Sequence, residues 1–86
     1  MTIYVVTAQS IDFVNKLYKL EEPALFLSPE RADTHIADLL DAEAYKFDDA
    51  GSTRTVDWLD DGVSRDYCWS DHQGNLYEIK LRKLEI

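Results

Sequence analysis

Residues 54–81 read RTVDWLDDGVSRDYCWSDHQGNLYEIKL, and apolar side chains recur at alternate positions within three segments of this stretch. A period of two is typical of β-strands that bury one face. The alternation is interrupted by two groups of turn residues, at 60–62 (Asp-Asp-Gly) and at 71–75 (Asp-His-Gln-Gly-Asn). The stretch therefore predicts three antiparallel strands that are joined by two consecutive hairpins.

A helix is predicted upstream of these strands. Ser28 is a favourable N-cap, Pro29 suits the first helical position, and Glu30 in the first turn complements the helix dipole. The apolar side chains that follow fall on one helical face: Ala32, Ile36, Leu39 and Leu40.

The first residues predict a strand over Thr2–Ala8, because β-branched and aromatic side chains occupy both parities. This pattern suits a strand that is covered on both faces. Ser10–Glu22 is ambiguous. Apolar residues at positions 13, 17 and 20, with an acidic residue early and basic residues late, favour a short helix, and a hairpin strand is the alternative.

Two further short strands are predicted. Pro23 ends the ambiguous segment, and the apolar run Ala24–Leu27 follows it. Ala44–Phe47 is a candidate for another strand, and residues 48–52 have the composition of a turn. We therefore expect one small globular domain over residues 1–86. Its fold class is α+β, an antiparallel sheet of four to five strands with one or two helices packed on one face.

The net charge of −8 lies in the middle of the chain. Between residues 30 and 71 there are 12 carboxylates and 4 basic side chains, whereas the charges of the two flanks cancel. Such a field attracts basic surfaces and repels nucleic acid and anionic lipid. We therefore expect a partner protein with a basic surface, no direct nucleic-acid binding and no membrane binding. Cys68 is the only cysteine, and the chain opens without a signal-like segment, so we expect a cytoplasmic protein.

The charges gather on two kinds of element. Spacing of 100° per residue puts the carboxylates of the predicted helix on the face opposite its apolar side chains, with Arg31 and His35 along one flank. Other carboxylates cluster around the turn at 60–62, beside a tryptophan. The predicted partner-binding residues are Glu30, Asp33, Asp38, Asp41, Asp57, Trp58, Asp60 and Asp61.

The aromatic side chains of the last third could in principle stack bases. Single-strand binders also need a basic groove, however, and here carboxylates stand between the aromatic residues. We expect most of these rings in the core. An exposed ring among carboxylates suits a partner's Arg and Lys, because it adds a cation–π contact to the ion pairs. The aromatic residues in question are Trp58, Tyr67, Trp69 and Tyr77.

No catalytic or metal-binding motif is present, so we expect no enzyme activity, no metal and no cofactor. Cys68, Asp71 and His72 lack the spacing of zinc ligands, and Asp57, Asp60 and Asp61 lack that of a calcium loop. His35 has no nucleophile or assigned carboxylate partner, which makes it a surface helix residue on this interpretation.

The layout resembles that of small acidic proteins encoded by phages and mobile elements, including anti-CRISPR and anti-restriction inhibitors. The resemblance rests on Ile3-Tyr4-Val5-Val6-Thr7, on the strand-to-helix step at residues 25–32 (LFLSPERA) and on Asp57-Trp58-Leu59-Asp60-Asp61. It implies inhibition without catalysis, by occupation of the basic nucleic-acid site of an effector or nuclease. These inhibitors share no motif, so no site residue is transferred. The basic segment at residues 80–83 (KLRK) departs from the type.

The sequence therefore predicts an acidic binding protein, as a monomer or a homodimer, that inhibits a nucleic-acid-binding protein or complex. One alternative is an interaction or structural module whose acidity serves only solubility. Another is a small metal-dependent enzyme, which requires a pocket where His35 or His72 meets carboxylates.

Overall fold

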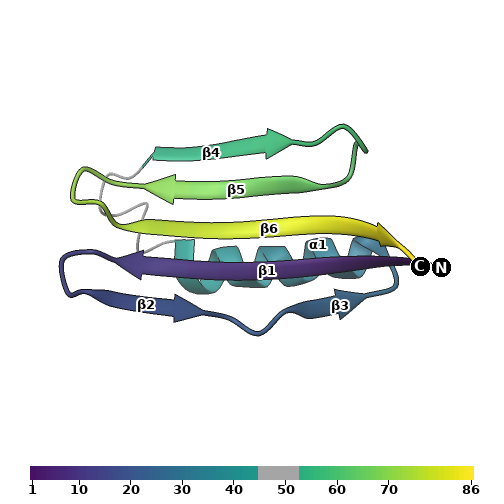
Figure 1. Ribbon diagram of the computed structural model, residues 1–86, viewed down its shortest axis with the longest axis horizontal. Helices are drawn as coiled ribbons and strands as arrows, with labels where there is room; N and C mark the ends of the chain where they lie inside the picture. Colours follow the sequence, from purple (N-terminus) through teal and green to yellow (C-terminus); the bar gives the residue numbers. More distant parts are fainter. Residues whose placement is uncertain (45–52) are drawn as a thin grey trace.

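The computed structural model describes residues 1–44 and 53–86, and shows an α+β fold in which one antiparallel sheet carries one α-helix (Figure 1). The sheet has six strands in the order β2-β1-β6-β5-β4, and β3 pairs with β1 beside β2. The elements are β1 (Thr2–Asp12), β2 (Leu17–Leu20), β3 (Ala24–Phe26), α1 (Pro29–Leu39), the π-helical turn η1 (Leu40–Ala44), β4 (Thr53–Trp58), β5 (Arg65–Ser70) and β6 (Leu76–Glu85).

The expected fold class is confirmed, but the expected four to five strands are six. The two C-terminal hairpins are present as β4-β5 and β5-β6, with turns at the predicted places. The additional pairing comes from β1, which continues to Asp12 and forms a hairpin with β2. Over residues 1–44 and 53–86 the order is therefore three strands, α1 with the turn η1, and three strands.

The prediction of a helix over Ser10–Glu22 is wrong, and the hairpin alternative is correct. Asp12 starts the turn, where its carboxylate accepts hydrogen bonds from the backbone and the side-chain nitrogens of Asn15 at 3.1 and 2.8 Å. Lys16 then has a left-handed backbone with φ 57°, which a helix cannot contain. The edge of β1 offers backbone hydrogen bonds to this segment, and that tertiary pairing overrides a weak helical period.

The helix begins where the sequence predicts. Ser28 is extended, and its side chain accepts a hydrogen bond from the backbone N–H of Arg31 at 3.2 Å. Pro29 occupies the first turn. Ala32 and Ile36 are buried, and Leu39 and Leu40 pack against the same core from the end of the helix. The predicted strand over Ala24–Leu27 is confirmed as β3, which leads directly into α1.

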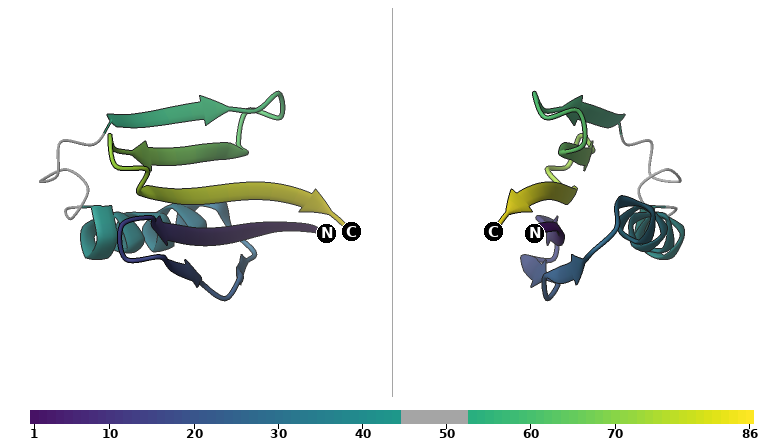
Figure 2. Two further views of the ribbon diagram at one scale, coloured as in Figure 1. Left: turned by 60° about the vertical axis from the view of Figure 1, so that its left-hand side comes forward. Right: turned by 90° about the vertical axis from the view of Figure 1, so that its right-hand side faces the viewer.

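The core lies between α1 and one face of the sheet. The right-hand view of Figure 2 shows α1 on that side of the sheet. Strands β1, β5 and β6 contribute alternate side chains to the core, and α1 contributes one stripe. The buried core residues are Val6, Ala8, Ala32, Ile36, Trp69, Tyr77, Ile79 and Leu81. The expectation that most aromatic residues belong to the core is met by Trp69 and Tyr77, whereas Trp58 is exposed.

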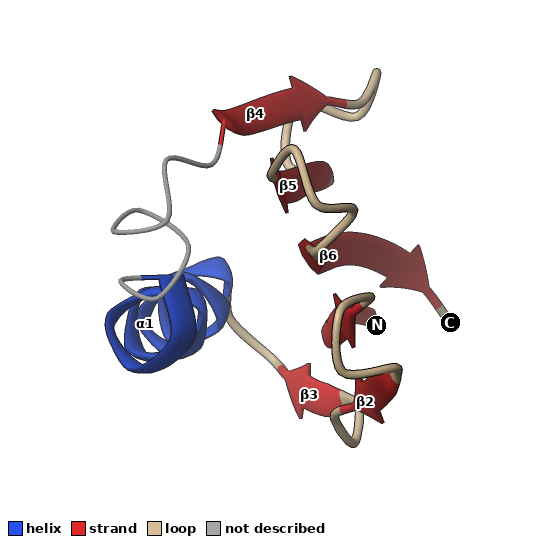
Figure 3. Cartoon of the chain, turned by 90° about the vertical axis from the view of Figure 1, so that its left-hand side faces the viewer, coloured by secondary structure: helices blue, strands red, loops and turns tan. Residues whose placement is uncertain are grey.

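The face of the sheet away from α1 carries no other element among the described residues (Figure 3). The expectation that the first strand is covered on both faces is therefore wrong. Val6 and Ala8 point to the helix and are buried, whereas Val5 and Thr7 point away from it and are half-buried. The strand and the turn predicted for 44–52 fall outside the described residues, apart from Ala44, which ends η1.

Candidate partner-binding surface

The outward face of α1, together with Asp41 of η1, which continues the helix, is acidic, as the sequence predicts. Glu30, Asp38 and Asp41 are exposed, and their carboxylates make no ion pair with any described residue. Thr34 and Ala37 lie between them and are exposed too. No described residue forms an ion pair with these three carboxylates, and they remain available to a partner. We call them the α1 carboxylates.

Asp33 has a different role from the other helix carboxylates. It is exposed to solvent, but its carboxylate contacts the guanidinium of Arg65 at the start of β5. The ion pair links the first half of α1 to the sheet, beyond the edge of the apolar core. Asp33 therefore belongs to the internal architecture as well as to the acidic face.

Arg65 is the residue that sequence reasoning missed. Only 8% of its surface is exposed, and it donates hydrogen bonds to the hydroxyl of Tyr67 at 2.6 Å and to the carbonyl of Val63 at 3.1 Å. Burial opposes its charge, but the hydrogen bonds to Tyr67 and Asp33 outweigh burial and raise its pKa. The sequence did indicate its burial, because Arg65 occupies a core-facing position in the period-two alternation of residues 54–81.

Trp58 lies beside this arginine, on β4. The guanidinium carbon of Arg65 is 5.0 Å from the centre of the Trp58 ring and 5.6 Å from that of Tyr67. Trp58 is nevertheless 62% exposed, since α1 does not extend over β4. The structure therefore brings two predicted site residues, Asp33 and Trp58, to one buried cation.

Asp60 and Asp61 stand together in the turn between β4 and β5 but differ in their interactions. Asp61 builds the turn: its carboxylate accepts hydrogen bonds from the hydroxyl and the backbone N–H of Ser64 and from the N–H of Val63. These bonds, the Ser64 hydroxyl first, lower the pKa of Asp61 to about 2. Asp60 is exposed and makes no such bond. It remains a candidate contact, whereas Asp61 is a structural residue.

Asp57 lies apart from the remaining predicted residues. It is opposite Asp66 in the β4-β5 ladder, and Asp66 pairs with Arg82 at 2.8 Å on the open face of the sheet. Because neighbouring strand residues alternate between faces, Asp57 and Trp58 point to opposite sides. A single flat partner surface on the helix side does not reach Asp57.

Two of the three basic side chains of β6, those of Lys80 and Arg82, also lie on this open face, and both are paired. Lys83 alternates to the helix side, where it is opposite Tyr4 and its charge acts on Asp61. Lys80 is 3.5 Å from Glu78, and Arg82 contacts Asp66. Their core-facing neighbours, Ile79 and Leu81, point towards α1. The unpaired α1 carboxylates and the paired basic residues are thus on opposite sides of the molecule.

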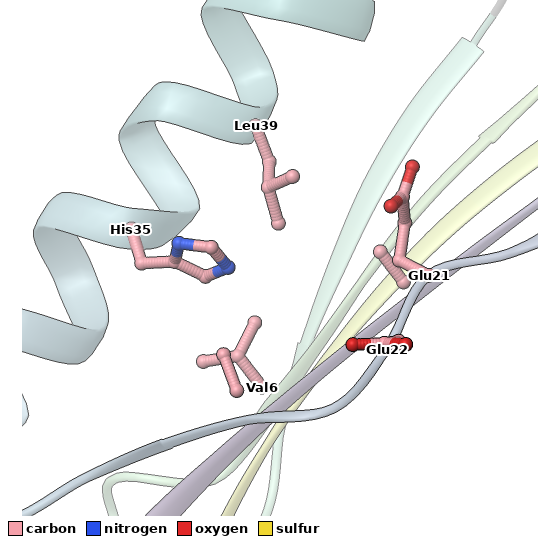
Figure 4. Close-up of a pocket in the computed structure, with 7 residues that line it drawn as sticks. Val6, Glu21, Glu22, His35 and Leu39 are labelled. Atoms are coloured by element: carbon pink, nitrogen blue, oxygen red, sulfur yellow. The ribbon is translucent and has the colours of Figure 1, made fainter.

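His35 lines a cleft of about 270 Å³ between α1 and the edge of the sheet (Figure 4). It is half-buried and its ring lies 5.3 Å from that of Phe26, which corrects its interpretation as a surface residue. Glu21 and Glu22 border the cleft from the β2-β3 connection. The remaining lining is apolar, with no nucleophile beside the imidazole: Val6, Ala8, Ala24 and Leu39.

The structure shows neither a metal site nor an activated cysteine among residues 1–44 and 53–86. No three His, Cys, Asp or Glu side chains of these residues are arranged as metal ligands. Asp71 accepts hydrogen bonds from Gln73 and Asn75 and shapes its turn. Burial raises the pKa of the Cys68 thiol, and nearby carboxylates, that of Glu78 first, raise it further, which is the reverse of activation.

None of the helices in the described ranges has the length and the apolar content of a membrane span. Comparisons of the chain with protein-family models, with curated proteins and with solved structures gave no match.

Proposed function

We propose that this protein is a non-catalytic inhibitor that binds the basic nucleic-acid site of an effector or nuclease through the α1 carboxylates, with Asp60 as an additional contact. The supporting observation is the segregation of charge. Glu30, Asp38 and Asp41 make no ion pair with a described residue on the helix side, while Lys80 and Arg82 of β6 are paired with carboxylates on the far side. A basic groove can approach α1 without meeting those cations.

The size of the acidic surface limits what it can imitate. Residues 30–41 rise about 16 Å at 1.5 Å per residue. Duplex DNA presents one charge per roughly 1.7 Å of axis, or roughly nine over the same length. Three carboxylates replace only a part of such an array. The proposed mechanism is therefore blockage of one part of a groove by the body of the domain, oriented by charge.

Charge would mainly govern how fast and in which orientation the complex forms. The α1 carboxylates attract the basic groove over a distance that salt shortens, since the Debye length is about 10 Å at 0.1 M ionic strength. Binding should therefore weaken as salt rises, and duplex DNA should compete for the same groove. An association driven by apolar burial alone would respond to neither.

The test uses the tagged protein as bait for bacterial lysate at low salt, with elution by duplex DNA and then by a salt step. The variant Glu30→Lys/Asp38→Lys/Asp41→Lys removes the proposed surface and leaves the Asp33–Arg65 pair in place. We expect it to lose the DNA-displaceable partner while its circular dichroism spectrum stays that of the parent.

A matched variant, Glu22→Lys/Asp57→Lys/Glu85→Lys, produces the same change in net charge at exposed positions away from the α1 carboxylates. We expect it to retain the partner. Equal loss in both variants would mean that only overall charge matters. Unimpaired capture by the α1 variant would contradict the proposed surface. A partner that resists both DNA and salt would favour an interaction module whose acidity serves solubility.

A further inference from the structure

The two edges of the sheet differ in how well they are protected from pairing with another strand. At one edge, β2 and β3 are separated by residues 21–23, which end in Pro23. A proline and a break of this kind discourage the addition of a strand. At the other edge, β4 runs without interruption over Thr53–Trp58 and contains no proline. Figure 1 shows its outer side uncovered.

The pairing with β5 determines which backbone groups of β4 are free. The N–H of Leu59 donates to the carbonyl of Ser64, so this opposed pair is hydrogen-bonded. Backbone groups of an antiparallel strand alternate between its two neighbours. Asp57 and Thr55 therefore bond to β5. The backbone N–H and C=O groups that point outward belong to Arg54, Val56 and Trp58.

The same three residues carry the side chains on the helix side of β4, and all three are exposed. Val56 is 38% exposed, and with Trp58 it forms an apolar strip along the edge. Arg54 stands at the opposite end of this strip from Trp58. The edge therefore offers, in order, a cation, an aliphatic side chain and an aromatic ring.

We propose that β4 is a homodimer interface, in which it pairs antiparallel with β4 of a second copy and Val56 lies on the two-fold axis. In this register Arg54 of each copy is opposite Trp58 of the other, and Val56 is opposite its own counterpart. Each opposed pair exchanges two hydrogen bonds, which makes about six in all. The two sheets become one continuous sheet.

Charge favours this register over its neighbours. A shift that centres the axis on Asp57 places two carboxylates directly opposite each other, which is destabilising. A shift in the other direction centres the axis on Thr55 and removes Trp58 from Arg54. With Val56 on the axis, Asp57 is opposite Thr55, whose hydroxyl can donate to it.

The contact between Arg54 and Trp58 makes the strand complementary to itself. Trp58 already accepts the cation of Arg65 from its own chain, at 5.0 Å from the ring centre. In the dimer the guanidinium of Arg54 from the second copy approaches the same ring from across the new strand pair. The strand is therefore complementary to itself in its side chains and has outward N–H and C=O groups to pair. For these two reasons we propose that a second copy of the chain binds this edge.

The proposal is independent of the inhibitor function. A two-fold axis perpendicular to the sheet keeps both copies of α1 on one side, and the α1 carboxylates remain exposed in the dimer. If no basic partner exists, the dimer still forms, and if the protein is monomeric, the α1 carboxylates are still available.

The test is sedimentation velocity and light scattering of the untagged protein over a wide concentration range. We expect a concentration-dependent dimer. Val56→Lys places two ammonium groups opposite each other on the axis and should raise the dissociation constant at least about tenfold. Val56→Pro removes an outward N–H that β5 does not use, so it should weaken the dimer without breaking the β4-β5 ladder.

Leu20→Lys is the matched control, because Leu20 is an exposed apolar residue with outward backbone groups on the other edge. It should leave the dimer unchanged. Circular dichroism checks that each variant is folded. A protein that stays monomeric at all concentrations, or a dimer that Leu20→Lys weakens as much as Val56→Lys does, would overturn the proposal.

Cross-linking tests the register independently of affinity. In a Cys68→Ser background, Val56→Cys should form an intermolecular disulfide under mild oxidation, since residues opposed on the axis have Cα atoms about 5.5 Å apart. Thr55→Cys, one residue away and also exposed, should not. Equal cross-linking of the two variants would contradict the register.

Discussion

Arg65 is a charged side chain in the seam between α1 and the sheet. It is held by Asp33, Tyr67 and the carbonyl of Val63, and it lies under the exposed ring of Trp58. The two partners of the ion pair differ in environment, since the Arg65 side chain is 9% exposed and that of Asp33 is 54% exposed. Their removal should therefore have unequal effects.

We predict that Arg65→Met lowers the free energy of unfolding by about 1–3 kcal/mol, because it leaves the groups around it without their donor. Asp33→Asn should cost under about 1 kcal/mol, because the Asp33 side chain is half exposed, its amide oxygen can still accept from Arg65, and the other hydrogen bonds of Arg65 remain. Urea denaturation of both variants measures the difference. Equal losses would contradict the view that Arg65 acts mainly through its buried hydrogen bonds.

Asp61 links the turn between β4 and β5 to pH. The pKa of Asp61 is about 2 in the folded protein, whereas the ordinary value for an aspartate is 3.8. The pKa is lowered because Ser64 and Val63 donate hydrogen bonds to the carboxylate. A group with a lowered folded pKa stabilises the fold above the unfolded pKa, and this contribution is lost as pH falls through the folded pKa. The loss belongs to the window between about pH 4 and pH 2.

We predict that Asp61→Asn, which keeps an acceptor oxygen but does not titrate, flattens the dependence of unfolding free energy on pH in that window. Asp60→Asn is the matched control, since Asp60 makes none of these bonds, and it should leave the slope unchanged. Urea denaturation at intervals from pH 5 to pH 2 gives both slopes. If Asp61→Asn kept the slope of the parent protein, the hydrogen bonds that Asp61 accepts in the turn would not be linked to its protonation.

The stability of α1 depends more on the N-cap in front of its first turn than on the side chains of its exposed face. Its N-cap is Ser28, whereas its outward face carries carboxylates and its last turn has no basic residue to offset the dipole. We predict that Ser28→Ala lowers stability by about 1 kcal/mol and that Ser28→Asp, a good N-cap, retains it. Thermal denaturation compares the two. Similar losses in both variants would mean that the cap contributes little to α1.

The hairpin at residues 12–17 shows how an element depends on its neighbour. Its turn is held by Asp12 and Asn15, and the N–H of Phe13 donates to the side chain of Asn75 at 2.9 Å. Gly74 has φ 88° and lies against Phe13, so a Cβ there would be 3.3 Å from the Phe13 ring. Two turns distant in sequence therefore stabilise each other, which local periodicity does not reveal.

On the helix side of the whole molecule, the α1 carboxylates are acidic side chains that form no ion pair with a described residue. Like charges three and four residues apart on a helix cost a few tenths of a kcal/mol each. Among the four helix carboxylates predicted to bind a partner, Asp33 alone forms an ion pair within the described part of the chain. Asp38 and Asp41, which are three residues apart, therefore weaken the isolated protein. Their presence is consistent with a role outside folding, in a contact or in solubility.

We predict that sodium chloride raises the melting temperature, since it screens this repulsion. The variant Asp38→Asn/Asp41→Asn should be more stable than the parent at low salt, and its melting temperature should respond less to salt. Scanning calorimetry at about 20 and 500 mM salt separates the two effects. A parent melting temperature that is independent of salt would contradict the predicted repulsion.

Local patterns in the sequence determined the helix at 29–39 and the strands of the last third. The capping residues, the apolar stripe and the period of two each act within a few residues, so no distant partner is needed to predict them. The exposed position of Glu30, Asp38 and Asp41 followed from the same periodicity. The fold class followed from the order of these elements.

Tertiary structure alone decided three other features. Residues 10–22 became a hairpin because β1 supplied an edge for β2, although the apolar spacing favoured a helix. The predicted site divided, with Asp57 on the open face and Asp33 and Trp58 around Arg65, because strand register and helix docking set which side chains meet. The unpaired edge of β4 exists because no other strand of the described chain reaches it. Pairings between residues far apart in the chain decide all three, and no local pattern encodes them.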